Sequence, residues 1–322
     1  MTEGKTMDSK IWAYYIKLSD HFWGDEYTEP KGWFPSPAYV ENNDIDFEVW
    51  DEVVAYLGEK KYTTLLIDVG DGVKYESHPE ISAPNAVSKE FLKQKIDEAK
   101  KLGIEAVPKL NFSTCHDTWM KDYRRMVSTS LYRKVVVDLI DETCELFDTP
   151  SLFHLGMDEE NDKLQTINEM STIRHEKVLW EDMNIMFDAC RRNHVRPWVW
   201  SDYYWDHPES FAKNMPLDVV QSNWFYRRFL NYGKDTPQYK HMMAYYGIRD
   251  LGYDQIPTCS QIAESANTIH TVKFGKRDLE NGHLLGFLTA SWVRTNRSDY
   301  FRLMNEAYKL YEARQKVYPE TL

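Results

Sequence analysis

Residues 152–160 read Leu-Phe-His-Leu-Gly-Met-Asp-Glu-Glu, and this stretch decides how we interpret the rest of the chain. It begins with apolar residues that favour a strand, passes a glycine, and ends in three consecutive carboxylates. A buried parallel strand that carries acidic side chains to the working face of a sheet has this pattern. We therefore expect a strand here, with Asp158 and Glu159 at its carboxyl end.

The pair formed by Asp158 and Glu159 is the first candidate for catalysis. Side chains alternate along a strand, so His154, Gly156 and Asp158 are expected on one side, which would be the inside of a barrel. Two adjacent carboxyls in a dry cleft do not both ionise easily, so one is expected to hold a proton at neutral pH and to serve as a general acid. The alternative is a solvated loop, or the first turn of a helix, where acids favour the positive end of the dipole.

The composition limits the class of protein. The 322 residues are 42% hydrophobic and 14% aromatic, enough for a large core in one barrel-sized domain or in two smaller ones. A net charge of -12 argues against nucleic acid as a partner. No run of about 18 apolar residues occurs, so no membrane span is expected. The 11 Trp and 21 Tyr suit a sugar or aromatic ligand, although filling the core is the alternative use.

The cysteines and the first residues bear on the compartment. The four cysteines show no Cys-x-x-Cys pair and are expected to be free thiols, or at least not needed for stability: Cys115, Cys144, Cys190 and Cys259. Residues 1–10 are polar and lack the apolar core of a secretion signal. A cytoplasmic location is expected unless a leader was removed, and no oligomeric state is predicted.

Strand and helix patterns alternate along the chain. Strands are predicted at 11–18, 63–69, 104–110, 152–160, 197–201, 218–222, 252–257 and 284–290, and helices at 47–58, 88–102, 132–147, 168–193, 262–274 and 300–317. This order predicts the α/β class and a single (β/α)8 barrel over residues 1–322. No Gly-x-Gly-x-x-Gly or P-loop follows a strand, so we expect no nucleotide and no other cofactor.

Active sites of such barrels lie where the strands end, so the strand-end residues are the candidates for the site. Carboxylates and amides there suit sugar hydroxyl groups, and aromatic rings suit the C–H faces of a neutral carbohydrate. Strand-end aspartates also cap helices, and histidines and tryptophans also occur as ordinary core residues. The candidates are Asp71, His116, Asp158, Glu159, Asp202, Tyr203, Trp224, Asp254, Trp292 and Arg294.

The acidic stretch resembles glycoside hydrolase family 20, the β-N-acetylhexosaminidases, whose signature strand reads His-x-Gly-Gly-Asp-Glu. Met157 replaces the second glycine here, while His116 after the third strand and Trp224 and Trp292 after late strands also match. The resemblance implies a retaining, exo-acting enzyme in which Glu159 protonates the glycosidic oxygen. It also implies that Asp158 orients the 2-acetamido group of the substrate, whose carbonyl oxygen attacks the anomeric carbon.

Three departures from that family point to a divergent relative with another sugar. Lys17 stands where the family has an arginine, and Arg294 stands near the usual position of a glutamate. We also expect no accessory domain before the barrel. Arg294 would neutralise an acidic sugar. Two alternatives are a two-carboxylate glycosidase, with Asp202 or Asp71 as nucleophile or base, and a carbohydrate-binding barrel without activity. No metal is expected, because the first strand has no His-x-His pair and the chain has no His-Glu-x-x-His.

Overall fold

The computed structural model describes residues 10–22, 40–167, 169–280 and 283–322. In this part of the chain, eight parallel strands lie in the order β6-β5-β4-β3-β2-β1-β8-β7. Isolated bridges join Gln221 to Gln255 and Trp224 to Thr258, so the two ends of that order also meet and the barrel closes. The predicted (β/α)8 fold is confirmed. The strands are β1 (Ile11–Lys17), β2 (Thr64–Asp68), β3 (Glu105–Lys109), β4 (Leu152–His154), β5 (Arg196–Trp200), β6 (Val220–Ser222), β7 (Thr258–Cys259) and β8 (Gly286–Ala290).

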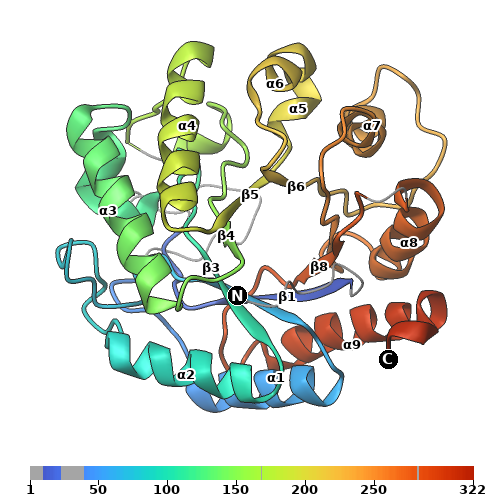
Figure 1. Ribbon diagram of the computed structural model, residues 1–322, viewed down its shortest axis with the longest axis horizontal. Coiled ribbons are helices and arrows are strands. Elements are labelled where there is room, and N and C mark those ends of the chain that lie inside the picture. The colour runs from blue at the N-terminus through green and yellow to red at the C-terminus, as the bar shows by residue number, and fades with distance from the viewer. Residues whose placement is uncertain (1–9, 23–39, 168, 281–282) are drawn as a thin grey trace, which may run out of the picture.

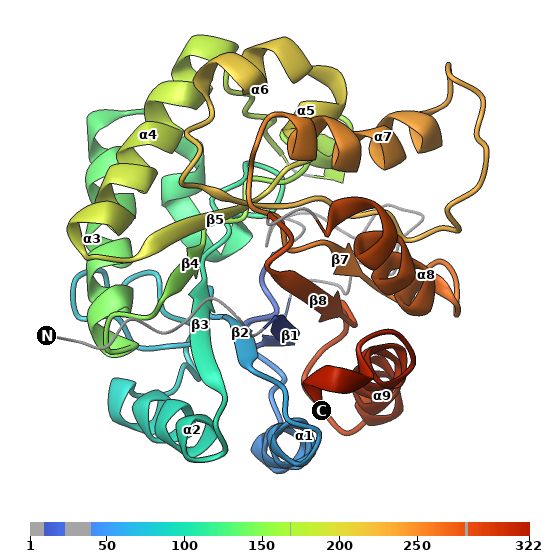
Figure 2. The same ribbon diagram turned by 45° about the vertical axis from the view of Figure 1, so that its right-hand side comes forward.

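Helices surround the barrel on the outside, as Figures 1 and 2 show from two directions. No helix of the described residues is long and apolar enough to cross a membrane. The α-helices are α1 (Phe47–Glu59), α2 (Lys89–Lys101), α3 (Ser130–Leu146), α4 (Glu176–Arg192), α5 (Tyr203–Asp206), α6 (Pro208–Asn214), α7 (Pro237–Asp250), α8 (Asn267–Phe274) and α9 (Tyr300–Val317). Short 3-10 helices lie at Thr118–Arg125, Leu164–Ile167 and Pro319–Thr321, and a π-helical turn lies at Gly275–Leu279.

Capping side chains fix where four of these helices begin. Asp46, Ser88, Thr129 and Thr236 precede α1, α2, α3 and α7, and each accepts a backbone N–H from the first turn. Such bonds satisfy donors that have no partner inside the helix. The cap and the apolar spacing agree in the first two helices, which is why the sequence located them well.

Alternate side chains of the strands build two apolar layers. One layer lies between the strands and the helices and holds most of the core, including Phe153 and Leu155. The other fills the inside of the barrel with large rings near its carboxyl end. This interior cluster consists of Ala13, Tyr15, Leu66, Val107, Leu152, Trp198, Trp200, Val220, Ile256, Leu288 and Ala290, with Trp224 and Trp292 packed against it.

Several predicted elements have other bounds in the structure: the strand expected at 152–160 ends at His154, and the helix expected at 262–274 begins at Asn267. The helix expected at 168–193 begins only at Glu176, because the buried side chain of Arg174 bonds to Glu160 and to the carbonyl oxygen of Phe112 and holds the preceding segment against the barrel. Residue 168 and most of the loop after β1, residues 23–39, lie outside the described residues. Within the strand expected at 252–257, only Gln255 forms bridges, to Gln221 and Leu284. The seventh strand itself is Thr258–Cys259 and follows Pro257, which has no N–H for the sheet.

Candidate active site

The acidic residues lie on a tight loop after β4 and not on the strand itself. β4 ends at His154, although the carbonyl oxygen of Gly156 still accepts the N–H of Trp200. Gly156, Met157 and Glu159 all have left-handed backbones, with φ of 72°, 70° and 55°. A left-handed conformation costs roughly 1–2 kcal/mol for a residue with a side chain. Strain of this kind is often found at functional sites, where surrounding bonds hold it in place.

Gly156 is required because Asn111 lies directly against it. A Cβ atom at position 156 would lie 1.9 Å from the Asn111 Oδ1 atom and 2.7 Å from its Cα atom. The same Oδ1 accepts the N–H groups of Met157 at 3.2 Å and Ser113 at 3.1 Å. The Asn111 amide nitrogen donates to Asp158 Oδ1 at 2.8 Å. Asn111 therefore fixes both the loop and the first carboxylate of the acidic pair.

His116 joins the two predicted catalytic acids. Its Nε2 atom lies 3.3 Å from Asp158 Oδ2 and 3.0 Å from Glu159 Oε2. Burial alone would lower the pKa of His116, but Asp158 and Glu159 raise it to about 10. Burial alone would raise the pKa of Asp158, but His116, with help from Lys109 and Asn111, holds it well below its usual range. At neutral pH the arrangement is therefore an imidazolium paired with the ionised carboxylate of Asp158.

The side chains of Asp158, Glu159 and Glu160 lie in different surroundings. The side chain of Glu159 is 31% exposed, that of Asp158 15% and that of Glu160 5%. Glu160 accepts the N–H of Thr114 at 2.9 Å and pairs with Arg174, whose side chain is fully buried. Glu159 is therefore the member of the three most open to a ligand, while Glu160 holds the loop to its neighbours.

The sequence reasoning did not find Arg174, which is a buried hub behind the acidic pair. Its guanidinium group pairs with Glu160 and Asp182 and donates to the carbonyl oxygen of Phe112 and to the Tyr132 hydroxyl. These partners come from the loops after β3 and β4 and from helices α3 and α4. No local pattern in the sequence predicts such a hub, because the partners of Arg174 lie far apart along the chain.

Asp202, after β5, lies directly behind Glu159. Its Oδ2 atom accepts the Glu159 N–H at 2.7 Å, and the residue is only 8% exposed. Its Oδ1 atom is buried and has no hydrogen-bond partner in the described part of the chain. Burial, followed by repulsion from Asp158, raises the pKa of Asp202 well above its usual range. A proton at this strand end was expected on Asp158 or Glu159, whereas the surroundings that favour a protonated carboxyl are those of Asp202.

Aromatic rings line the same end of the barrel. Trp292 stands with its ring centre 5.0 Å from that of Tyr15, 5.8 Å from that of Trp200 and 6.3 Å from that of Tyr226. Trp224 continues the group, 5.2 Å from Tyr226. We use the name mouth cluster for the acidic loop and these rings: His116, Asp158, Glu159, Tyr15, Trp200, Trp224, Tyr226 and Trp292.

Below the mouth cluster, inside the barrel, lies a buried ion pair that the sequence reasoning missed. Lys109 pairs with Asp68, and the Tyr15 hydroxyl donates to the same Asp68 oxygen at 2.6 Å. Lys17 is also buried, and its Nζ atom donates to the carbonyl oxygen of Trp292 at 3.2 Å. Burial lowers the pKa of Lys17 to about 8. Lys17 was named in the sequence analysis, and a charged residue at the end of an otherwise apolar strand was the available signal for Lys109.

Two predicted site residues are committed to other contacts. Asp71 is fully buried and accepts from Ser19 Oγ at 2.7 Å, with His21 Nδ1 at 2.6 Å from its other oxygen. It therefore ties the loop after β1 to the loop after β2. Tyr203 packs outside the barrel, 5.6 Å from Trp180 on α4 and 4.5 Å from His207.

Two further predicted residues lie apart from the mouth cluster. Asp254 is at the opposite end of the barrel, 2.7 Å from Arg196 at the start of β5 and 3.0 Å from His283 before β8. It was expected to follow a strand, but β7 begins after it, so its predicted place at the mouth is corrected. Arg294 is at the rim, 3.8 Å from Asp20 and 3.7 Å from Asp44.

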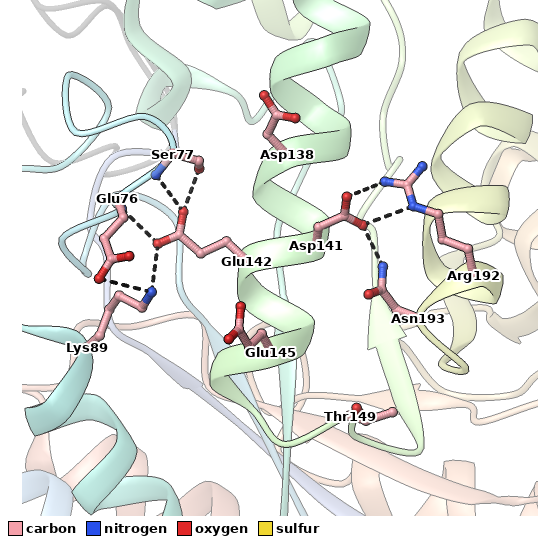
Figure 3. A pocket seen from close by; sticks show the side chains of 10 residues that line it. All are labelled: Glu76, Ser77, Lys89, Asp138, Asp141, Glu142, Glu145, Thr149, Arg192 and Asn193. Carbon is pink, nitrogen blue, oxygen red and sulfur yellow. Dashed lines mark hydrogen bonds and ion pairs between the residues drawn. The ribbon is translucent and has the colours of Figure 1, made fainter.

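An open groove of about 770 Å³ lies on the outer wall of the barrel, among α2, α3 and the end of α4 (Figure 3). Its charged side chains are largely paired with one another. Glu142 accepts the N–H groups of Glu76 and Ser77 and lies 3.3 Å from Lys89, and Arg192 pairs with Asp141. None of the residues that line it belongs to the mouth cluster, so we do not assign the chemistry to this groove.

The mouth cluster also has the spacing of a metal site. Among the described residues, ligand atoms of His116, Asp158 and Glu159 lie within 4.8 Å of one another. Imidazole binds a metal through a nitrogen without a proton. The raised pKa of His116 keeps its ring protonated at neutral pH, so the imidazolium stands where a cation would. In the described structure the His116 ring therefore pairs with both carboxylates.

Comparisons with known proteins place the fold. No protein-family model matches the chain, and no curated protein matches its sequence. A β-N-acetylhexosaminidase from Bacteroides fragilis has a similar structure, with 13% identity and a TM-score of 0.62 over 93% of this chain and 65% of that chain. The chitobiase of Flavobacterium johnsoniae has 15% identity and a TM-score of 0.60 over 94% of this chain and 52% of that chain. Dispersin B has 12% identity and a TM-score of 0.59 over 95% of this chain and 98% of that chain.

The lengths of these relatives differ. The chain spans about half to two thirds of the first two proteins and nearly all of dispersin B. At identities of 12–15% the likeness concerns the fold. In its fold, the chain resembles the β-N-acetylhexosaminidases of glycoside hydrolase family 20.

Proposed function

We propose that this protein is a glycoside hydrolase that cleaves β-linked 2-acetamido sugars with retention of configuration. One observation carries the proposal: Asp158 and Glu159 share His116 at the carboxyl end of the barrel strands, beside a group of aromatic rings. Solved structures of this fold that bear the name β-N-acetylhexosaminidase support the same class of reaction.

In the proposed mechanism Asp158 works as an anion. Its contacts with His116 and Asn111 favour the ionised form. An ionised carboxylate accepts the N–H of an acetamido group and stabilises the positive charge that develops when the carbonyl oxygen of that group bonds to the anomeric carbon. The same carboxylate orients the carbonyl oxygen for attack, so the enzyme needs no nucleophile of its own.

Glu159 is the proposed proton donor. It gives its proton to the glycosidic oxygen while the bond from that oxygen to the anomeric carbon breaks and the alcohol leaves. In the second step Glu159 takes a proton from the water that attacks the anomeric carbon, and the acetamido group is restored. Its side chain is the most exposed of the three consecutive acids, which supports this role.

Aromatic and rim residues are the proposed substrate contacts. We assign Trp224 and Trp292 to the sugar faces and His116 to the catalytic pair. Arg294 lies at the rim between Asp20 and Asp44, which already balance its charge. We therefore assign Arg294 to sugar hydroxyl groups, and its neighbours do not favour the selection of an acidic sugar. Asp71, Tyr203 and Asp254 are left out of the proposed contacts.

The test is a panel of aryl β-glycosides with a 2-acetamido or a 2-hydroxyl group. Wild type is expected to cleave the acetamido substrates far faster, and Glu159→Gln to lower their kcat by about 10²–10⁴-fold. Asp162→Asn, an exposed acid on the same loop, is the matched control and is expected to leave the rates unchanged. Binding without cleavage would indicate a binding barrel. Equal cleavage of the 2-hydroxyl substrates would indicate a two-carboxylate glycosidase.

A further inference from the structure

The backbone of Glu159 is strained, and hydrogen bonds hold both its N–H and its carbonyl oxygen. Its φ of 55° is left-handed, a conformation that costs a residue with a side chain roughly 1–2 kcal/mol. Asp202 Oδ2 accepts the N–H of Glu159 at 2.7 Å, while the carbonyl oxygen of Glu159 accepts the N–H of Asn161 at 2.6 Å. Cys115 Sγ at 2.6 Å and Asn161 Nδ2 at 3.0 Å also donate to that carbonyl oxygen. Asp202 is the acceptor that holds the N–H of Glu159, and with it the direction in which the side chain leaves the loop.

Asp202 occupies surroundings that disfavour a negative charge. It is 8% exposed, and one of its oxygens has no hydrogen-bond partner in the described part of the chain. After burial, the strongest influence on it is the negative charge of Asp158. A buried carboxyl beside other carboxylates keeps its proton.

Asp158 offers the contrast within the same site. It is also largely buried, but its two oxygens face the imidazolium of His116 and the amide of Asn111. Neighbouring acids whose surroundings favour opposite protonation states take different parts in a mechanism. Asp158 has the surroundings of an anion, and Asp202 has those of a neutral acid.

We propose that Asp202 is a positioning residue, a neutral carboxylic acid whose carbonyl oxygen holds the backbone of Glu159, and that it is neither the nucleophile nor the base of the reaction. This assignment rests on the proposed function for the identity of Glu159 as the proton donor. Its Oδ2 atom accepts the Glu159 N–H, so the proton resides on Oδ1. The proposal separates this chain from a two-carboxylate glycosidase, in which the second acid must be ionised to act.

Asparagine and alanine at position 202 distinguish the roles. Asparagine keeps the shape, the neutral charge and an oxygen acceptor for Glu159, whereas alanine removes the acceptor. We expect Asp202→Ala to lower kcat by about 10²-fold with little change in KM, the size of a misplaced catalytic group. Asp202→Asn is expected to restore kcat to within a few-fold of wild type. A nucleophile or base replaced by asparagine would instead lose about 10²–10⁴-fold, and that result would overturn the proposal.

A second readout does not depend on activity. The folded pKa of Asp202 is raised above its unfolded value, so its stabilising contribution is complete below the unfolded pKa of about 3.9 and is lost as the pH rises toward the folded pKa. Asp202→Asn lacks this loss. As the pH increases from 4.5 to 7.5, the urea midpoint of Asp202→Asn should therefore rise relative to that of wild type.

The two readouts separate the possible failures. A wild type that cleaves no glycoside would refute the proposed function, and the urea midpoints would still test the protonation of Asp202. A wild type that cleaves 2-acetamido glycosides, with an Asp202→Asn variant as inactive as Asp202→Ala, would refute the positioning role alone. A midpoint difference that shrinks or reverses with rising pH would show that Asp202 is ionised in the folded protein.

Discussion

The contact between Gly156 and Asn111 makes a sharp prediction about stability. In Gly156→Ala the new Cβ atom would lie 1.9 Å from the Asn111 Oδ1 atom and 2.7 Å from its Cα atom. Backbone atoms cannot move aside as a flexible side chain can, so the loop or the third strand must shift. The shift would also weaken the bond from Asn111 to Asp158, which is 2.8 Å long.

The magnitude follows from two contributions. Alanine in a left-handed conformation costs roughly 1–2 kcal/mol. Overpacking of a well-filled region costs a further 1–3 kcal/mol or so, which gives a total of about 2–5 kcal/mol. Gly103 is the matched control, because its φ is 80° and a Cβ atom there would meet nothing within 4 Å. Gly103→Ala should therefore show the backbone cost alone.

Urea unfolding of both variants measures the difference. We expect Gly156→Ala to lose about 1–3 kcal/mol more than Gly103→Ala in the free energy of unfolding. Its kcat should also fall by about 10²-fold, because the acidic pair is displaced, while Gly103→Ala keeps full activity. Equal stability and equal activity of the two variants would refute the account of how Asn111 holds the acidic loop.

Two further predictions concern buried charges away from the reacting atoms. Burial raises the pKa of Glu306 to about 7 from an unfolded value near 4.5. The free energy of unfolding of wild type should therefore fall by up to roughly 3 kcal/mol as the pH rises through that window. Glu306→Gln should remove this loss, which urea titrations at pH 4.5 and 8 measure. A pH dependence unchanged in Glu306→Gln would exclude it as the source. Arg174→Met leaves Glu160 and Asp182 without their buried partner and should lower the free energy of unfolding by about 3–5 kcal/mol. Arg191→Met, which breaks an exposed pair, should lower it by about 1 kcal/mol or less. Equal losses in urea unfolding would contradict the role of Arg174 as a buried hub.

The sequence was most informative where local pattern and tertiary packing agree. The apolar strands, the capped helices and the run ending in Asp158 and Glu159 each carry their signal within a few residues, so the barrel and the acidic pair could be predicted. Strand ends were located less well. Asp254 was expected at the carboxyl end of the strands, but β7 begins after it, so Asp254 lies at the opposite end of the barrel. Tyr203 turns outward although it follows β5.

Contacts between distant residues account for what the sequence did not reveal. Arg174 meets Glu160 and Asp182 only after the barrel has closed, and Lys109 meets Asp68 across neighbouring strands. The loop after β4 presented a different difficulty. Alternation along a strand was extended to Asp158, but the left-handed Gly156 and Met157 end that rule before the acids are reached. The roles of Glu159 and Asp158 therefore rest on the site geometry and stay predictions.

The central claim is that Glu159 donates a proton to the departing alcohol, and leaving-group dependence tests it most directly. We would measure kcat/KM of wild type and Glu159→Gln on aryl 2-acetamido β-glycosides whose phenols range from weakly to strongly acidic. A poor leaving group needs the proton, so the variant should lose about 10²–10⁴-fold on it. A strongly acidic phenol leaves without help, so the loss on that substrate should be far smaller. An equal loss on every substrate, or no loss at all, would contradict the assignment of Glu159 as the general acid.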